Sequence, residues 1–169
     1  IHEKAKAGLF QTSSLLNILE NVSLAPLSTL RVGGAARFFV EAGTESDVAA
    51  AVEHAAAGGM EIFILGGGSN ILVSDKGFDG LVVRIVLKGI EPARGGDSER
   101  EVITASAGVA WDSFVECCVG RDLAGVDCLS GIPGTVGGTP VQNVGAYGQE
   151  VSETIVSVRC RDRQSGRIV

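Results

Sequence analysis

Apolar residues recur at helical spacing between residues 3 and 20, and this pattern predicts an amphipathic helix there. The residues on or near its apolar face are Leu9, Leu15, Leu16 and Leu19. Residues 22–28 contain Pro26 and are expected to form a loop. A short apolar run then predicts a strand over residues 36–41. The chain therefore begins with a helical extension over residues 1–20, followed by a first folded lobe over residues 21–90.

The next helix is predicted from both of its ends. Thr44 is followed three residues later by Asp47, which stands where a capping box has its acidic residue. Alanines, which favour helices, fill the segment as far as Ala57. Gly58 and Gly59 then end the helix.

Three further strands are predicted in the first lobe. A buried strand over residues 61–65 leads into a run of glycines, and two more strands are expected over residues 71–73 and 81–87. A turn at residues 76–80 joins the last two strands. The first lobe thus has the order strand, helix, strand, glycine loop, strand, turn, strand.

A second lobe is expected over residues 91–169. The polar stretch over residues 91–100 contains a proline and two glycines, and is the expected connection between the lobes. The elements predicted after it are a strand (101–107), a helix (111–120), a strand of alternating polarity (154–163), a turn (164–166) and the start of another strand. A hairpin interrupted in its second strand suggests a fragment of a longer chain.

Two glycine-rich segments are the most informative features of the chain. The first, residues 65–72, reads Leu-Gly-Gly-Gly-Ser-Asn-Ile-Leu, and the second, residues 130–148, has six glycines and two prolines among nineteen residues. A flexible linker is polar and repetitive, whereas apolar residues alternate with the glycines here. Such segments indicate buried backbone that approaches a ligand closely. Two of them in one small chain predict a large, phosphate-bearing cofactor between them.

The first segment has the composition of an anion site. Three consecutive glycines after a strand let successive backbone N–H groups converge on an anion, and Ser69 and Asn70 add side-chain donors. The segment is neither a G-x-G-x-x-G motif nor a P-loop, because no long helix and no lysine follow it. The alternative is a glycine-rich turn that binds nothing.

The second segment combines close backbone approach with polar groups. Gly137 and Gly138 let the backbone pass near a flat ring or a pyrophosphate. The amides of Gln142 and Asn143 and the ring of Tyr147 are suited to a heteroaromatic edge or a sugar. The alternative is an Ω-loop held by its own side chains. Long irregular loops are functional or disordered, and the apolar content argues against disorder.

Composition narrows the functional classes. With 45% hydrophobic and 20% charged residues the chain is globular, and its net charge of −6 without a basic run excludes a nucleic-acid partner. Its apolar runs are too short to span a membrane. The four cysteines and two histidines form no metal-binding spacing, so no metal is expected. The simplest interpretation of the four cysteines is that they are reduced thiols in a cytoplasmic protein.

Three blocks carry a resemblance to a known family. They are residues 27–36 (Leu-Ser-Thr-Leu-Arg-Val-Gly-Gly-Ala-Ala), 65–72 and 130–148. In order and spacing, the chain resembles the UDP-N-acetylenolpyruvoylglucosamine reductase family, flavoenzymes that complete UDP-N-acetylmuramate synthesis for peptidoglycan. The likeness covers roughly residues 21–169.

The resemblance implies an α+β fold, namely the two-lobed FAD-binding domain of the vanillyl-alcohol-oxidase (PCMH) type. It also implies noncovalent FAD between the lobes, NADPH as electron donor and an enolpyruvyl UDP-sugar as substrate of the complete enzyme. The residues implied for the pyrophosphate loop are Gly66, Gly67, Gly68, Ser69, Asn70, Ile71 and Leu72. Those implied near the ribityl chain and isoalloxazine are Ala107, Gly108, Ser130, Gly131, Ile132, Gly134, Gly137, Gly138 and Val144. Asn143 and Tyr147 match positions on the substrate side.

The sequence also departs from that family. It ends before the expected tyrosine–arginine segment and the substrate-binding domain, which carries the catalytic serine and its supporting glutamate. No catalytic residue is therefore assigned, and we expect FAD binding with little or no turnover. Two alternatives stay open: a non-catalytic flavin-binding module, and an oxidase of the wider family with covalent flavin. For the latter, His2 and His54 are poorly placed as attachment residues, whereas Cys128 lies close to the second glycine-rich segment.

Overall fold

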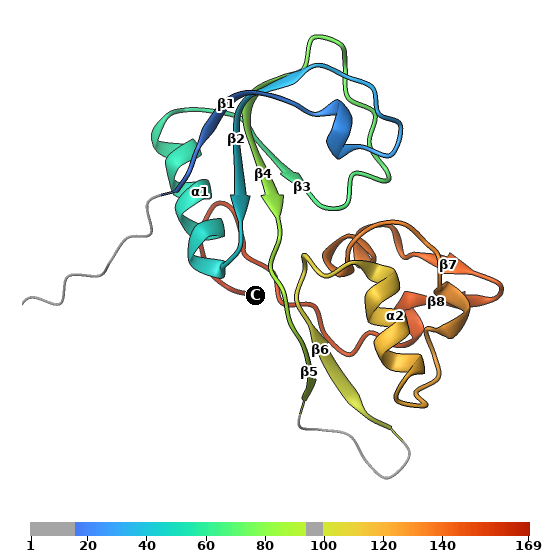
Figure 1. Ribbon diagram of the computed structural model, residues 1–169. Helices are drawn as coiled ribbons and strands as arrows, with labels where there is room; N and C mark the ends of the chain where they lie inside the picture. Colours follow the sequence, from blue (N-terminus) through green and yellow to red (C-terminus); the bar gives the residue numbers. More distant parts are fainter. Residues whose placement is uncertain (1–15, 94–99) are drawn as a thin grey trace, which may run out of the picture.

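Figure 1 shows the computed structural model, which describes residues 16–93 and 100–169. The first lobe is built on a four-stranded sheet in the order β1-β2-β4-β3. Its strands are β1 (Leu19–Ser23), β2 (Ala35–Ala42), β3 (Ile62–Leu65) and β4 (Phe78–Ile85). β1 runs antiparallel to β2, whereas β4 runs parallel to both β2 and β3.

The central strand β4 is buried on both faces. Leu81 and Val83 lie in the core that contains α1 (Glu45–Ala57), whereas Val82 lies in the core on the opposite face. A parallel strand covered on both sides needs a continuous apolar run rather than an alternating one. The sequence around residues 81–83 supplies that run, so the strand predicted there is confirmed.

Helix α1 forms as its capping signals predict. The Thr44 hydroxyl accepts a hydrogen bond from the backbone N–H of Asp47 (3.1 Å), and the Asp47 carboxylate accepts one from the Thr44 N–H (2.9 Å). The buried residues of the helix are Ala51 and Ala55, which face the sheet. Small side chains at these positions let the helix lie close to the strands.

The second lobe has little regular structure. β5 (Ile90–Ala93) pairs antiparallel with β6 (Val102–Ala105), and α2 (Trp111–Val119) follows. β7 (Gly145–Ala146) and β8 (Gln149–Glu150) form a short hairpin. Short 3-10 helices cover Ala25–Leu27 in the first lobe and Asp127–Leu129, Val136–Gly138, Pro140–Gln142 and Val151–Glu153 in the second.

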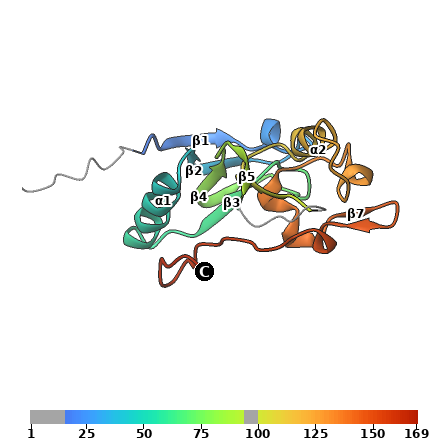
Figure 2. The ribbon, with the colours of Figure 1, turned by 90° about the horizontal axis from the view of Figure 1, so that it is seen from below.

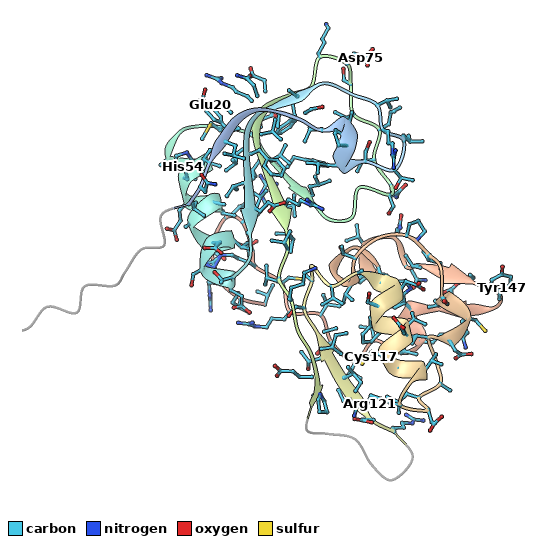
Figure 3. All side chains as sticks on the ribbon, viewed as in Figure 1. Glu20, His54, Asp75, Cys117, Arg121 and Tyr147 are labelled. Atoms are coloured by element: carbon cyan, nitrogen blue, oxygen red, sulfur yellow. The ribbon has the colours of Figure 1, made fainter. Side chains whose placement is uncertain are left out.

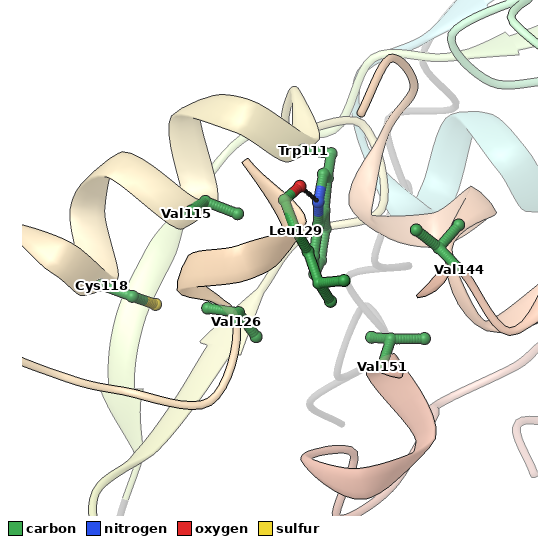
Figure 4. Packing of buried hydrophobic residues seen from close by; sticks show 7 residues of the cluster. All are labelled: Trp111, Val115, Cys118, Val126, Leu129, Val144 and Val151. Carbon is green, nitrogen blue, oxygen red and sulfur yellow. Dashed lines mark hydrogen bonds between the residues drawn. The ribbon is translucent and has the colours of Figure 1, made fainter. Parts of the chain in front are cut away.

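The core of the second lobe gathers around the Trp111 indole (Figure 4). Trp111 is 2% exposed, and its ring N–H donates to the backbone carbonyl of Leu129 (2.9 Å). The other buried members of this core are Val115, Cys118, Val126, Leu129, Val144 and Val151. Helix α2 and the glycine-rich segment after it therefore share one core.

The N-terminal helix prediction is wrong at its end. Residues 1–15 lie outside the described residues, but Leu19 and Glu20 belong to β1 and pair with Phe39 and Phe38 of β2. Helical spacing is a local signal, and pairing with a strand of the sheet overrides it.

Three other predicted elements differ in the structure. Residues 71–73 form no strand, and neither do residues 155–160. The turn near residue 165 is nevertheless confirmed, because Cys160 and Val169 exchange backbone hydrogen bonds of 2.8 and 2.9 Å. Most of the polar stretch, residues 94–99, lies outside the described residues, but its start, Glu91–Ala93, belongs to β5, and the chain passes from β4 to β5 over residues 86–89.

The last residues of the chain return to the first lobe. Arg159 forms an ion pair with Glu45 at the start of α1. Residues 160–164 border a cavity of about 860 Å³ together with Met60 and Ile62. Figure 2 shows this terminal segment on the side of the molecule away from β1. No helix within the two described ranges is long and apolar enough to cross a membrane.

Candidate functional site

A second cavity, of about 480 Å³, lies where the two lobes meet. Its walls are residues 64–71 from the first lobe and residues 133–135, 137–139, 141, 142 and 144 from the second, with Ile85 and Ala107 between them. This volume lies within the range of roughly 300–1,000 Å³ that is typical of small-molecule sites. Because both glycine-rich segments face this cavity, we take it as the candidate cofactor site.

The structure brings many of the predicted site residues to this cavity. The predicted residues that line it are Gly66, Gly67, Gly68, Ser69, Asn70, Ile71, Ala107, Gly134, Gly137, Gly138 and Val144. The predicted residues outside its lining are Leu72, Gly108, Ser130, Gly131, Ile132, Asn143 and Tyr147.

Some lining residues had no place in the predicted set. They are Ile64, Leu65, Ile85, Pro133, Thr135, Thr139 and Val141, whereas Gln142, whose amide the sequence indicated as suited to a ligand, also lines the cavity. Ile64, Leu65 and Ile85 stand at the carboxyl ends of the parallel strands β3 and β4. Ligands of open α/β sheets bind at that edge, so the strand pattern carried a signal for these three residues.

The two walls touch each other directly. A Cβ atom on Gly67 would lie 2.7 Å from the Cα atom of Gly134, so only glycine allows this backbone approach. The Ser69 hydroxyl donates a hydrogen bond to the Pro133 carbonyl (3.0 Å), and the Asn70 amide donates one to the Gln142 side chain. The floor of the cavity is therefore a junction between residues far apart in the sequence.

The glycine loop of the first wall is supported from behind. Gly68 is buried with φ +70°, and a Cβ atom there would lie 1.9 Å from the Leu27 carbonyl oxygen. The Thr29 N–H donates to the Gly68 carbonyl (3.0 Å). Residues 27–29, the start of the first sequence block, thus fix the conformation of the loop in the second block.

The backbone N–H groups of the first wall have no acceptor in the described part of the chain. Among residues 16–93 and 100–169, no hydrogen bond uses the N–H group of any residue from 66 to 70 as a donor. None of the described residues that line the cavity is charged. An anion bound here would therefore be held by backbone dipoles, as in other glycine-rich anion sites.

The second wall, in contrast, is bonded internally. The N–H groups of Val136 and Gly137 donate to the carbonyls of Val109 and Ala107, both at 2.9 Å. The Gly138 N–H donates to the Thr135 carbonyl (2.8 Å). These bonds make the second wall a firm backbone platform, and its free surface is largely apolar.

Ser130 and Gly131 are held by a carboxylate outside the cavity. One oxygen of Asp112 accepts hydrogen bonds from the Gly131 N–H (2.6 Å) and the Ser130 hydroxyl (2.9 Å). These two bonds, that from Gly131 first, lower the pKa of Asp112 below its usual value. Both residues contribute to the shape of the second wall from behind it.

Asn143 and Tyr147 also lie away from the cavity lining. The Asn143 amide donates to Glu150 (2.7 Å) and accepts from the Ser152 N–H (3.1 Å), so it braces the β7–β8 hairpin. Tyr147 stands at the tip of that hairpin and is 91% exposed (Figure 3). Their place on the substrate side stays a prediction.

No side chain is placed for covalent flavin attachment at this cavity within the described residues. Neither His54 nor Cys128 lines it. Burial and the Asp127 carboxylate raise the pKa of the Cys128 thiol, which makes it a weaker nucleophile. The described part of the chain also contains no cluster of His, Cys, Asp and Glu able to hold a metal ion.

Comparison with known families decides the class of domain. The model of a family described as "FAD binding domain" matches residues 36–169, which is most of the chain. The chain belongs to this FAD-binding family. The predicted two-lobed α+β fold of the vanillyl-alcohol-oxidase (PCMH) type is confirmed, and so is FAD as its cofactor.

Curated relatives belong to the family that the three sequence blocks resemble. A UDP-N-acetylenolpyruvoylglucosamine reductase of Saccharopolyspora erythraea is 50% identical over 146 residues, which is 86% of this chain and 40% of that protein. One of Nocardia farcinica is 48% identical over 151 residues, or 89% of this chain and 38% of that protein. The chain thus spans about two fifths of the length of these relatives, and its resemblance to the reductase family is confirmed.

A solved structure agrees with the same relationship. The crystal structure of UDP-N-acetylenolpyruvylglucosamine reductase (MurB) from Thermus caldophilus is 29% identical, with a TM-score of 0.62. The alignment covers 82% of this chain and 46% of that one.

Proposed function

We propose that this chain is the FAD-binding part of an NADPH-dependent UDP-N-acetylenolpyruvoylglucosamine reductase. The reaction would convert UDP-N-acetylglucosamine enolpyruvate to UDP-N-acetylmuramate, a precursor of peptidoglycan. Relatives of that name support the proposal. The structural observation that carries it is the row of unused backbone N–H groups at residues 66–70, which faces a second glycine-rich wall across one cavity.

The first wall fits a pyrophosphate. Five consecutive N–H groups at the carboxyl end of β3, which have no acceptor among the described residues, suit the oxygens of a dianion. The hydroxyl of Ser69 donates to Pro133, and the Asn70 amide donates to Gln142. We therefore assign the phosphate contacts to the backbone of residues 66–70, with these two side chains holding the loop against the opposite wall.

The second wall fits a flat ring and the chain attached to it. Ala107, Gly137, Gly138 and Val144 present little more than backbone and methyl groups to the cavity. Such a surface accepts an aromatic system in close contact and keeps water away from it. When bound, the flavin supplies two-electron hydride chemistry, with NADPH as the proposed donor.

The role of this chain in the reaction is binding and orientation. We assign no proton donor to the residues of this chain. We propose that most contacts to the UDP-sugar come from the rest of the complete enzyme. We propose two lobes, over residues 21–90 and 91–169 in the division made from the sequence, with Ile90 counted in the second lobe because it begins β5. A cytoplasmic location is also proposed, and the four unpaired cysteines are consistent with a reducing compartment.

The test begins with titration of the purified chain with FAD, followed by visible absorbance and calorimetry. We expect saturable uptake and, after acid precipitation, release of intact FAD into the supernatant. Flavin that stays with the precipitate would favour the covalent oxidase. A folded protein that takes up no FAD would refute the proposal.

The substrate is tested separately in a longer protein that contains this chain. NADPH oxidation is followed with and without UDP-N-acetylglucosamine enolpyruvate. We expect substrate-dependent oxidation and formation of UDP-N-acetylmuramate. A flavin-loaded longer protein that never reduces this substrate would instead support the non-catalytic module or another oxidoreductase.

A further inference from the structure

The first turn of α2 is bonded to both ends of the segment that leads into the second wall. The Trp111 ring N–H donates to the Leu129 carbonyl (2.9 Å), as the dashed line in Figure 4 shows. The backbone N–H of Trp111 donates to the Gly134 carbonyl (3.1 Å). Residues 129 and 134 are therefore both fixed to one buried residue.

Asp112, the next residue, holds the middle of that segment. Its carboxylate accepts from the Ser130 hydroxyl at 2.9 Å and from the Gly131 N–H at 2.6 Å. Hydrogen bonds to a charged acceptor are roughly twice as strong as neutral ones. These bonds, that from Gly131 first, lower the pKa of Asp112 below its usual value because they favour its carboxylate form.

The held segment contacts the opposite wall within two residues. Pro133 follows Gly131 closely, and its carbonyl accepts the hydrogen bond from Ser69 in the glycine loop (3.0 Å). Gly134, the next residue, is the one that approaches Gly67. The position of residues 130–134 therefore determines how far apart the two walls of the cavity stand.

We propose that Asp112 is a positioning residue of the FAD site, which sets the separation of the two walls without touching the cofactor. Asp112 does not line the cavity. Its negative charge therefore stays off the surface where we place the pyrophosphate, while its hydrogen bonds act on that surface through residues 130–134. This inference rests on the proposed function of the cavity.

The experiment compares the whole chain with Asp112→Ala, Asp112→Asn, Ser130→Ala and the control Glu116→Ala. Glu116 is an exposed carboxylate on the same helix, so its removal changes the charge of α2 equally. For each protein, FAD affinity, the visible spectrum of the saturated complex and the melting temperature without FAD are measured. The last value separates a loss of folding from a loss of site geometry.

We expect Asp112→Ala to weaken FAD binding at least fivefold and to shift the spectrum of the bound flavin towards that of free FAD. Asp112→Asn keeps an acceptor oxygen and is expected to restore much of the affinity. Ser130→Ala removes one of the two bonds and is expected to have a smaller effect, and Glu116→Ala none.

Two results would overturn the inference while leaving the proposed function intact. One is wild-type affinity and spectrum in folded Asp112→Ala. If Asp112→Ala does not fold, the second such result is wild-type FAD affinity and a wild-type flavin spectrum in both Asp112→Asn and Ser130→Ala. Failure of the wild-type chain to bind FAD would instead refute the proposed function.

Discussion

Replacement of Gly67 by alanine tests whether the two walls meet as described. The added Cβ atom would lie 2.7 Å from the Cα atom and 3.0 Å from the carbonyl carbon of Gly134, and 3.4 Å from the Thr135 nitrogen. Carbon atoms in contact normally stand about 3.5–4.0 Å apart. The walls must therefore separate by about 1 Å, because all three neighbours are backbone atoms that no rotamer change can move.

The magnitude follows from the cost of such overpacking. Forcing an extra methyl group into a tight contact costs about 1–3 kcal/mol. If that cost falls on the bound state, FAD affinity drops about 5- to 150-fold, since about 1.4 kcal/mol corresponds to a factor of ten. If it falls on the folded chain, the free energy of unfolding drops by the same amount.

Two measurements on Gly67→Ala cover both possibilities: calorimetric titration with FAD, and urea unfolding without FAD. The matched control is Gly43→Ala, because a Cβ atom on Gly43 would lie 3.9 Å from its nearest neighbour, an Asp47 oxygen, and Gly43 lies outside the cavity. We expect the control to keep wild-type FAD affinity. Wild-type affinity and wild-type stability together in Gly67→Ala would refute the direct contact between the walls.

Three further changes have defined outcomes. Trp111→Phe leaves the Leu129 carbonyl without its buried partner and is expected to cost about 1–3 kcal/mol in urea unfolding; an unchanged midpoint would contradict that role. Tyr147 has φ 51° at a hairpin turn that favours Asn-Gly, so Tyr147→Asn should raise the unfolding free energy by up to about 1 kcal/mol without changing FAD affinity. Hydrogen bonds lower the pKa of three carboxyl groups in the folded chain. The stability that these bonds contribute to the fold is complete above the usual carboxyl pKa of about 3.9, and it is lost as the pH falls through the lowered pKa values. The three groups are Asp112, Asp127 and Asp162. The unfolding free energy should therefore fall as the pH is lowered through their pKa values, and an unchanged unfolding free energy from neutral to acid pH would argue against these bonds.

Much of the local structure could be predicted because its causes lie within a few residues. The capping box of Thr44 and Asp47 and the glycines after Ala57 determine both ends of α1. The apolar run of β4 also follows from the pattern itself. The glycine-rich segments indicated a cofactor site because interleaved glycine and apolar residues imply close approach of buried backbone.

Other features depend on partners that are distant along the chain. Residues 19–20 form a strand because β2 is available beside them, which no helical spacing reveals. Ser69 meets Pro133 across 64 positions, and this contact decides which parts of the second segment face the cavity.

The sequence by itself thus determined which segments are able to bind a cofactor, since backbone freedom and polarity are properties of the residues. Only the tertiary structure decided that Gly134 and Gly137 line the cavity while Ser130 and Gly131 turn to Asp112. The direction in which a loop residue faces is determined by the hydrogen bonds and contacts that the folded neighbours offer it.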